Sequence, residues 1–340
     1  MDLSHGGDWA GFHEKYGRLP LDFSASTTPL PMPGGIRTAV LRSLDEADRY
    51  PDPLCRKLTT ALGRKHGVPS GHILCGAGAA DLLFRLVLAK RPRRALIVEP
   101  AFSGYEEALR TTDCQIERLF LRESDNFAPT KDLLSHIEPG LDMLFLCSPN
   151  NPTGRTVPPE LLQKIWERCR QCGTLPVLDA CFEDFLPGPP QDGPFVLRSF
   201  TKCYPMAGLR LGYAVCSDTE LLEQMSRQGQ PWPVSAPAQA AGMAALEEHE
   251  YSVRLSALIR EQRPVLEAGL TELGCRVIPG EANFLLFFCP DTELDRKLER
   301  RGILLRNCTN FPGLGPGWYR TAVRTEAENQ ILLRLMREVL

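Results

Sequence analysis

A lysine, two hydroxyl side chains and an arginine stand close together in the sequence. Ser199, Thr201 and Lys202 fall within four residues, and Arg210 follows between two glycines. Hydroxyls and a guanidinium bind phosphate well, and glycine lets the backbone approach such a ligand closely. A lysine beside a phosphate site can hold an aldehyde cofactor as an imine. Taken alone, Lys202 would more often be a solvated loop lysine, so this prediction depends on its neighbours.

Three further positions follow apolar runs and could serve the same ligand. Asn151 lies in the turn Asn-Asn-Pro-Thr-Gly and could place an amide donor near a phenolate oxygen. Asp179 ends an apolar run, where a buried carboxylate needs a partner such as a protonated pyridine nitrogen. A capping role for the next segment is the alternative for Asp179. Gly78, Ala79 and Ala80 open a predicted helix whose free N–H groups could bind phosphate.

Short apolar strands that alternate with helical stretches would bring these residues together. Such a pattern predicts an α/β fold with a largely parallel sheet, covered on both faces, that binds ligands at the carboxyl ends of its strands. The predicted strands are Ala95–Glu99, Met143–Cys147, Leu175–Asp179, Phe195–Ser199 and Leu211–Cys216, and the clearest helices are Ala79–Lys90 and Glu160–Cys172.

The pattern changes after about residue 233. A long helical region runs to Glu272, a compact strand covers Asn283–Cys289, and a helix ends the chain. That last helix is predicted to bury one stripe, made of Ile331, Leu332, Leu335 and Val339. We therefore predict an N-terminal arm over residues 1–40 that packs with the small domain, a large domain over 41–230 and a smaller α+β domain over 231–340.

Composition argues against several classes of protein. The 340 residues have a formal net charge of −3 with both signs mixed, so there is no electrostatic case for nucleic acid or a membrane surface. The start of the chain lacks the features of a secretory signal, and no apolar run could span a bilayer. The twelve cysteines are scattered, which predicts free thiols in a reducing compartment and no metal site. We expect a cytoplasmic protein.

Together, the motifs around Asn151, Asp179, Lys202 and Arg210 resemble those of the fold type I aminotransferase superfamily in order and spacing. The resemblance implies pyridoxal phosphate as the cofactor and a homodimer with shared active sites. It implies that Lys202 forms a Schiff base with the cofactor. Asp179 would pair with the ring nitrogen, and Asn151 would bond the ring hydroxyl.

The same resemblance assigns two aromatic residues. Phe102 would stack on the cofactor ring, and Tyr50 would reach the phosphate bound by the neighbouring subunit. For either residue taken alone, core packing is the more frequent role.

A narrower resemblance, to the L-threonine-O-3-phosphate decarboxylases, covers nearly the whole chain. This family makes the aminopropanol phosphate linker of cobalamin. The resemblance implies that Arg320 binds the substrate carboxylate and that His5 and Arg306 bind its phosphate. The related histidinol-phosphate aminotransferases share the core motifs but lack the His-Gly-Gly start. The matching segments are 5–7, 21–25, 49–52, 231–234, 305–314 and 319–324.

Two departures leave the substrate open. Ser26 and Thr28 stand where that family carries asparagines, and the first of these lies near the substrate phosphate in the family. A decarboxylase of phosphoserine and an aminotransferase of the histidinol-phosphate type are therefore the alternatives. A regulatory module that only binds the cofactor is a third, with no additional DNA-binding segment to support it.

Overall fold

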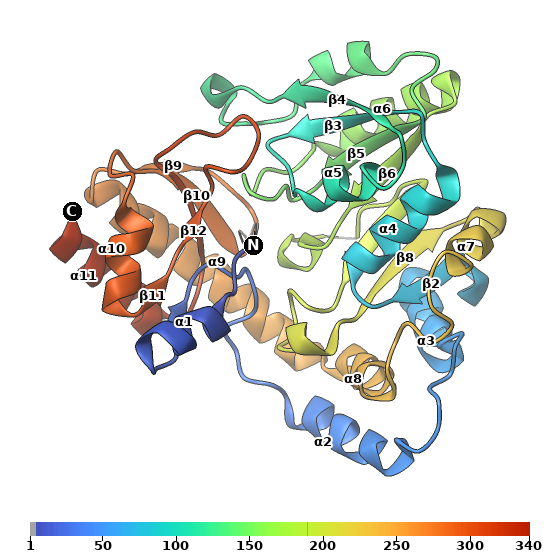
Figure 1. Ribbon diagram of the computed structural model, residues 1–340, viewed down its shortest axis with the longest axis horizontal. Helices are drawn as coiled ribbons and strands as arrows, with labels where there is room; N and C mark the ends of the chain where they lie inside the picture. The colour runs from blue at the N-terminus through green and yellow to red at the C-terminus, as the bar shows by residue number, and fades with distance from the viewer. Residues whose placement is uncertain (1–4, 189) are drawn as a thin grey trace.

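A seven-stranded sheet forms the core of the larger part of the computed structural model, which describes residues 5–188 and 190–340 (Figure 1). Its strands are β2 (Ile73–Gly76), β3 (Arg94–Glu99), β4 (Gln115–Phe120), β5 (Met143–Cys147), β6 (Leu175–Asp179), β7 (Phe195–Ser199) and β8 (Gly212–Cys216). Their order is β2-β8-β7-β6-β5-β3-β4, and the pairs are parallel except those that involve β8. The predicted fold class, with its largely parallel sheet, is confirmed.

The reversed direction of β8 matters for what meets at the sheet edge. Gly212, its first residue, pairs with Ser199 of β7 and with Gly76 of β2. Residues just before β8 therefore lie beside residues that follow β2 and β7. The sequence predicted this strand, beginning one residue earlier, but not its direction.

Helices cover both faces of this sheet. They are α4 (Ala79–Lys90), α5 (Gly104–Leu109) and α7 (Thr219–Ser226) on one face, and α6 (Pro159–Cys172) on the other. α6 begins with proline at its first position and ends at Gly173, whose φ of 72° suits glycine. Among the described residues, no helix is both long and apolar enough to cross a membrane.

The C-terminal part has its own antiparallel sheet, in the order β12-β13-β10-β9 (Figure 1). These strands are β9 (Arg276–Ile278), β10 (Phe284–Phe288), β12 (Arg306–Asn307) and β13 (Trp318–Ala322). The accompanying helices are α8 (Ala236–Glu247), α9 (His249–Glu272), α10 (Leu294–Arg301) and α11 (Glu326–Val339). The predicted long helical region is thus two helices that meet at Glu248.

The stripe predicted for the last helix was wrong in part. Ile331 is 37% exposed, and the buried residues of α11 are Asn329, Leu332, Leu333 and Met336. Leu333 packs against Gly269 of α9, where a β-carbon would collide with Leu333 Cδ1. The buried amide of Asn329 is satisfied, because it donates to the carbonyl of Arg324 at 2.9 Å.

The two ends of the chain meet in a short parallel pairing. β1 (Leu21–Asp22) pairs with β11 (Ile303–Leu304). The blue helix α1 (Trp9–Tyr16) lies beside α10 in Figure 1, where Lys15 Nζ is 2.9 Å from Glu299 Oε1. The chain then passes through α2 (Gly34–Ser43), which packs on α8, and α3 (Arg56–His66) before it enters the large sheet.

Candidate active site

The strand ends bring the residues singled out in the sequence into two adjoining cavities, of about 290 and 140 Å³. Shared lining residues include Ala80, Phe102, Asn151, Lys202 and Arg210. The smaller cavity also has Ala79, Asp179, Ser199 and Thr201 in its wall. The larger cavity also has His5, Ser26, Arg306 and Arg320. Residues expected to hold a cofactor therefore surround one cavity, and residues expected to hold a substrate line the other.

Lys202 follows β7 and lines both cavities. Burial is the main cause that lowers the pKa of its amine, and the positive charges of Arg320 and Arg210 lower it further. Asp179 and Cys181 act in the opposite direction. A lowered pKa enlarges the fraction of neutral amine, which is the form that attacks a carbonyl carbon.

Asp179, the last residue of β6, has its carboxylate held by two hydrogen bonds. The Tyr105 hydroxyl donates to Oδ2 at 2.6 Å, and the backbone N–H of Cys181 donates to Oδ1 at 3.0 Å. Burial, followed by the charge of Asp179, raises the pKa of Tyr105 well above its usual value, so the phenol stays a donor. The turn contact with Cys181 corresponds to the capping alternative, yet the carboxylate also lines the smaller cavity.

Hydroxyl groups, a helix start and a guanidinium meet at one end of the smaller cavity. Ser199 Oγ lies 2.7 Å from Thr201 Oγ1 and accepts the Thr201 N–H at 3.1 Å. Gly78 precedes α4 with a φ of 93°, and a β-carbon there would lie 2.8 Å from Arg210 Nη2. Arg210 therefore lies at the N-terminus of α4. Such a cluster is suited to a phosphate group.

Arg320 connects three segments of the chain. Its Nη1 donates to Asn151 Oδ1, and its Nη2 donates to the carbonyl of Ser24 at 3.0 Å. Its Nε is buried and has no partner among the described residues. Burial lowers the pKa of Arg320 to about 10, which leaves it charged at neutral pH. A buried guanidinium that lines a cavity is suited to bind a carboxylate.

Arg306 stands directly opposite Arg320 on the neighbouring antiparallel strand. Its Nη2 donates to Asn310 Oδ1 at 2.8 Å, and its guanidinium lies 5.1 Å from the centre of the Phe311 ring. Like charges directly opposite each other on adjacent strands destabilise a sheet. Two buried arginines in this register therefore indicate that the larger cavity receives an anionic ligand.

His5 adds a third basic group to this cavity. Its ring centre lies 5.5 Å from that of Phe102, and its Nε2 lies 3.9 Å from Glu107 Oε1. Partial burial is the main cause that lowers the pKa of His5, and Arg306 and Arg320 also lower it, whereas Glu107 raises it. An anion bound beside these groups would raise the pKa again.

Ser26 and Thr28, which stand where the decarboxylase family carries asparagines, lie in different surroundings. Ser26 lines the larger cavity, and its buried hydroxyl has no partner within the described part of the chain. Thr28 bonds the hydroxyl of Tyr251 at 2.8 Å, in a buried contact. Of the two positions, therefore, only Ser26 lies where it can affect the substrate.

The two aromatic residues differ in position. Phe102 lines both cavities and meets Tyr105 edge-on, with 5.7 Å between ring centres. Tyr50 is 77% exposed and stacks on Trp232 at 4.2 Å. It does not line either cavity of the single chain.

The family model for aminotransferase class I and II matches residues 24–335. The chain belongs to this family. The threonine-phosphate decarboxylase of Salmonella typhimurium is 41% identical, with 100% of this chain and 97% of that protein covered. A histidinol-phosphate aminotransferase of Symbiobacterium thermophilum is 34% identical over 89% of this chain and 85% of its own length. The crystal structure of the histidinol-phosphate aminotransferase from Clostridium acetobutylicum superposes with a TM-score of 0.87 at 24% identity, covering 94% of this chain and 98% of that one.

Class I and II aminotransferases use pyridoxal phosphate, and this is the cofactor of the chain. The smaller cavity fits it. Its lining would allow the Lys202 amine to meet the aldehyde, the Asp179 carboxylate to pair with the ring nitrogen and the Asn151 amide to bond the ring hydroxyl. Arg210, at the start of α4, and the hydroxyls of Ser199 and Thr201 fit the phosphate.

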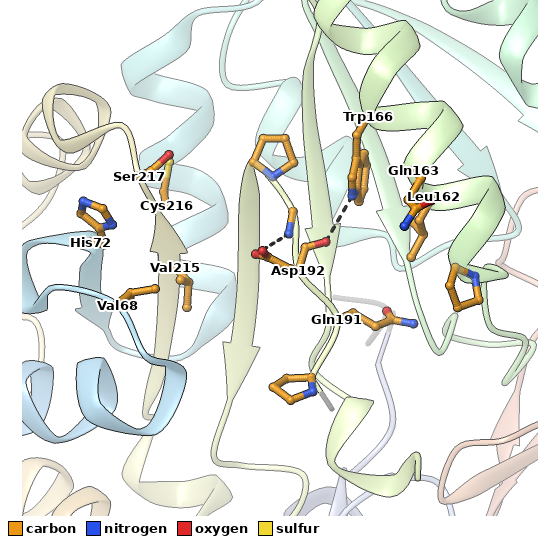
Figure 2. Close-up of a pocket in the computed structure, with 14 residues that line it drawn as sticks. Val68, His72, Leu162, Gln163, Trp166, Gln191, Asp192, Val215, Cys216 and Ser217 are labelled. Atoms are coloured by element: carbon orange, nitrogen blue, oxygen red, sulfur yellow. Dashed lines mark hydrogen bonds between the residues drawn. The ribbon is translucent and has the colours of Figure 1, made fainter. Parts of the chain in front are cut away.

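Size does not identify the site in this aminotransferase-family chain. A larger cavity, of about 620 Å³, lies beside Trp166 of α6 and the end of β8 (Figure 2). Trp166 Nε1 donates there to the carbonyl of Asp192 at 3.2 Å. Figure 2 shows His72 and Asp192 apart, on opposite sides of Ser217, and no lysine or arginine is among the described lining residues. The charged side chains of Lys202 and Arg210 line the two smaller cavities instead.

Sequence reasoning missed two residues that support the site. Tyr105 lies in the short helix α5, and its partner Asp179 is 74 positions away, so no local pattern signals this contact. Ser24 entered only through the family resemblance. Its partners, Gly7 and Arg320, lie 17 and 296 positions away, and no local pattern signals such contacts.

Proposed function

We propose that the chain decarboxylates L-threonine O-3-phosphate to (R)-1-amino-2-propanol phosphate, for the linker of cobalamin. The observation that carries this proposal is the pair of arginines directly opposite each other, Arg306 and Arg320, in the cavity that Lys202 also lines. A substrate with a phosphate and a carboxylate offers one anion to each. The 41% identity to a threonine-phosphate decarboxylase over the whole chain supports the same reaction.

In this proposal, the two anionic ends fix the substrate. Arg320, held by Asn151 and by the carbonyl of Ser24, binds the carboxylate. Arg306 and His5 bind the phosphate. Bound pyridoxal phosphate supplies an aldehyde for the substrate amine and a ring that accepts the electron pair when a bond to Cα breaks. The positions of Arg320 and of the Arg306–His5 pair determine which bond at Cα is aligned for cleavage.

Lys202 then transfers the proton that Cα needs after the carboxylate is lost. Carbon dioxide leaves without the bonding electrons, and Cα gains one proton, which Lys202 Nζ delivers. Burial lowers the pKa of the Lys202 amine, so its protonated form gives up a proton more readily than an ordinary lysine does. Asp179, held by Tyr105, keeps the pyridine nitrogen of the cofactor protonated. Phe102 would stack on the ring.

Two alternatives have specific support. A histidinol-phosphate aminotransferase is 34% identical to the chain, and in that reaction Lys202 would move the Cα proton while the carboxylate stays. Ser26, which lines the larger cavity, departs from the asparagine of the decarboxylase family, and this leaves phosphoserine as a second decarboxylase substrate.

The test is to incubate the protein, loaded with pyridoxal phosphate, with threonine phosphate, serine phosphate and histidinol phosphate. We expect carbon dioxide release to be fastest with threonine phosphate and absent with histidinol phosphate. The Lys202→Ala variant serves as the control and should release none. Amino transfer to 2-oxoglutarate without carbon dioxide from either hydroxy-amino-acid phosphate would contradict the proposal.

The proposal includes a cytoplasmic homodimer. Tyr50 and Trp232 stack on each other while 77% and 40% exposed, and the nearby Leu54 is 61% exposed. Exposed aromatic and aliphatic side chains of this size are typical of a surface that a second subunit covers. Sedimentation of the cofactor-loaded protein should give twice the chain mass of 37.9 kDa.

A further inference from the structure

A chain of hydrogen bonds joins Asp22, Ser24 and Gly7 beside the larger cavity. Ser24 Oγ donates to Asp22 Oδ1 at 2.6 Å, and the backbone N–H of Gly7 donates to Ser24 Oγ at 2.8 Å. A hydroxyl has one proton, and because that proton goes to the carboxylate, the oxygen is left to accept from Gly7. The bond to an ionised acceptor also polarises the hydroxyl and strengthens the bond that it accepts.

The two glycines after His5 are suited to this contact. A β-carbon at Gly6 would collide with the backbone carbonyl of Ser24. Gly7 has a φ of 92°, which few other residues adopt. The backbone from His5 to Gly7 therefore lies against Ser24, and this contact gives the His-Gly-Gly start a structural reason.

The same bond holds His5 at the cavity. His5 lines the larger cavity with Arg306 and Arg320. On its C-terminal side, the first side chain that holds its backbone segment is Ser24, through Gly7. The next anchor is Asp8, which caps α1 by accepting the Gly11 N–H at 3.0 Å.

Ser24 also reaches the opposite side of the cavity. Its carbonyl accepts Arg320 Nη2 at 3.0 Å, and Ser24 is only 4% exposed. Its two polar groups therefore serve different partners: the carbonyl supports Arg320, and the hydroxyl supports the segment that carries His5. A side-chain substitution removes the second contact and leaves the first.

We infer that Ser24 is a positioning residue whose hydroxyl, supported by Asp22, holds His5 at the place where the substrate phosphate binds. This inference rests on the proposed function, since that function assigns His5 to the phosphate. Ser24 also lines the cavity, but its hydroxyl proton is engaged by Asp22. Ser24 therefore acts through His5 rather than on the substrate.

The local turn does not depend on this hydroxyl. Asp22 Oδ1 also accepts the backbone N–H groups of Ser24 at 2.7 Å and of Ala25 at 3.2 Å. These bonds remain in Ser24→Ala, so the variant keeps the turn and loses the link to Gly7. A matched control is Ser43→Ala, which removes a hydroxyl bonded to the carbonyl of Val40 in the distant helix α2.

The first experiment measures the binding of inorganic phosphate to the cofactor-loaded protein by calorimetry, in Ser24→Ala, His5→Ala and the double variant. Loss of one supporting hydrogen bond should raise the dissociation constant about fivefold to tenfold in Ser24→Ala, with no change in Ser43→Ala. In the His5→Ala background, the same substitution should raise it less than about twofold, because coupled residues are not additive. An equal factor in both backgrounds would overturn the inference.

The second experiment follows hydrogen exchange in a peptide that contains Gly7. Its amide should exchange about tenfold faster in Ser24→Ala than in the wild type or in Ser43→Ala, because the acceptor is gone. Unchanged exchange in Ser24→Ala would also overturn the inference. A wild-type protein that releases no carbon dioxide, yet shows this change in exchange and the coupled phosphate binding, would disprove the proposed function and leave the role of Ser24 intact.

Discussion

The cavity that fits the cofactor and the cavity that fits the substrate are built differently. Asp179, Lys202 and Arg210 stand at the edge of one seven-stranded sheet, beside strands of five residues. His5 and Arg306, by contrast, come from opposite ends of the chain. Arg306 lies in β12, and the strand that follows His5 along the chain is β1; each of these strands has two residues.

The difference lies in what holds the backbone in place. On the cofactor side, buried strand ladders through β5, β6 and β7 fix the strand ends relative to one another. On the substrate side, side chains donate to the backbone of distant segments. Arg320 bonds the carbonyl of Ser24, Arg324 that of Asp22 and Asn283 that of Ser26. We therefore expect cofactor-side substitutions to change chemistry and substrate-side substitutions to change binding.

The largest effect is expected on the cofactor side. Lys202→Ala should lower turnover at least about 10³-fold, because the proton at Cα loses its carrier. The absorbance band of the lysine-bound cofactor should disappear as well. Lys65→Ala, at an exposed position of α3, should retain both. Survival of the band in Lys202→Ala would contradict the assignment.

On the substrate side, Arg320→Gln should lower kcat/KM for threonine phosphate by about 10²-fold, because a charge-assisted pair to the carboxylate is lost. Steady-state kinetics at several substrate concentrations would separate KM from kcat. Arg276→Gln, in the same small sheet, removes an exposed pair with Glu123 and should change neither. An unaltered KM in Arg320→Gln would show that the carboxylate binds elsewhere.

The buried Glu99 tests how a charge at the end of a strand changes the stability of the large sheet. It ends β3, is 2% exposed, and burial raises its pKa to about 7 from the ordinary 4.5. The folded state therefore favours the neutral acid, and stability present below pH 4.5 is lost as the pH rises through 7. Glu99→Gln should be about 2 kcal/mol more stable than wild type at pH 8 and equally stable at pH 4.5.

Urea unfolding at the two pH values measures this difference. Glu14→Gln, at an exposed position of α1, should show no such gain. A Glu99→Gln variant that is less stable than wild type at pH 8 would mean that the pair with Arg118, at 3.8 Å, stabilises the fold more than burial of the charge destabilises it.

The smallest effect concerns His5 and pH. Its pKa is lowered in the free protein, and a bound phosphate would raise it, so binding takes up a proton. Affinity gained through His5 is then complete below the lowered pKa of the free protein and is lost as the pH rises through the higher pKa of the complex. The KM of His5→Asn should exceed that of wild type about fivefold at pH 6 and approach it at pH 8.5. Since the ratio cancels the ionisation of the substrate, a constant ratio across this range would refute a charged His5.

Much of the large sheet could be predicted because its central strands are buried on both sides. β5, β6 and β7 match their apolar runs residue for residue. The edge strand β4 was missed, since its residues are mostly half-buried and give no continuous apolar run. The direction of β8 depends on pairing across the sheet, which no local pattern records. The stripe of the last helix was predicted only in part, because the tertiary contacts that bury Leu333 and leave Ile331 exposed are not visible in the local pattern.

For the site, the sequence identified side chains better than it identified their supports. Lys202, Asp179 and Asn151 follow predicted strands, so the rule that ligands bind at strand ends brought them together in advance. Their roles stay predictions. The supports Tyr105 and Ser24 could not be found in the same way, since each acts by a hydrogen bond to a residue far along the chain.

The contact between Ser24 and Arg320 has a consequence for how the protein folds while it is being made. The contact between Ser24 and Arg320 spans 296 positions. A ribosome that has released residue 216 has already supplied every strand of the large sheet, whereas Arg320 of β13 is made about 100 residues later. Contacts so distant in sequence form late, because a long loop must close first. A nascent chain should therefore complete the cavity beside Lys202 first, and form the contacts of Arg320 with the N-terminal segment only later.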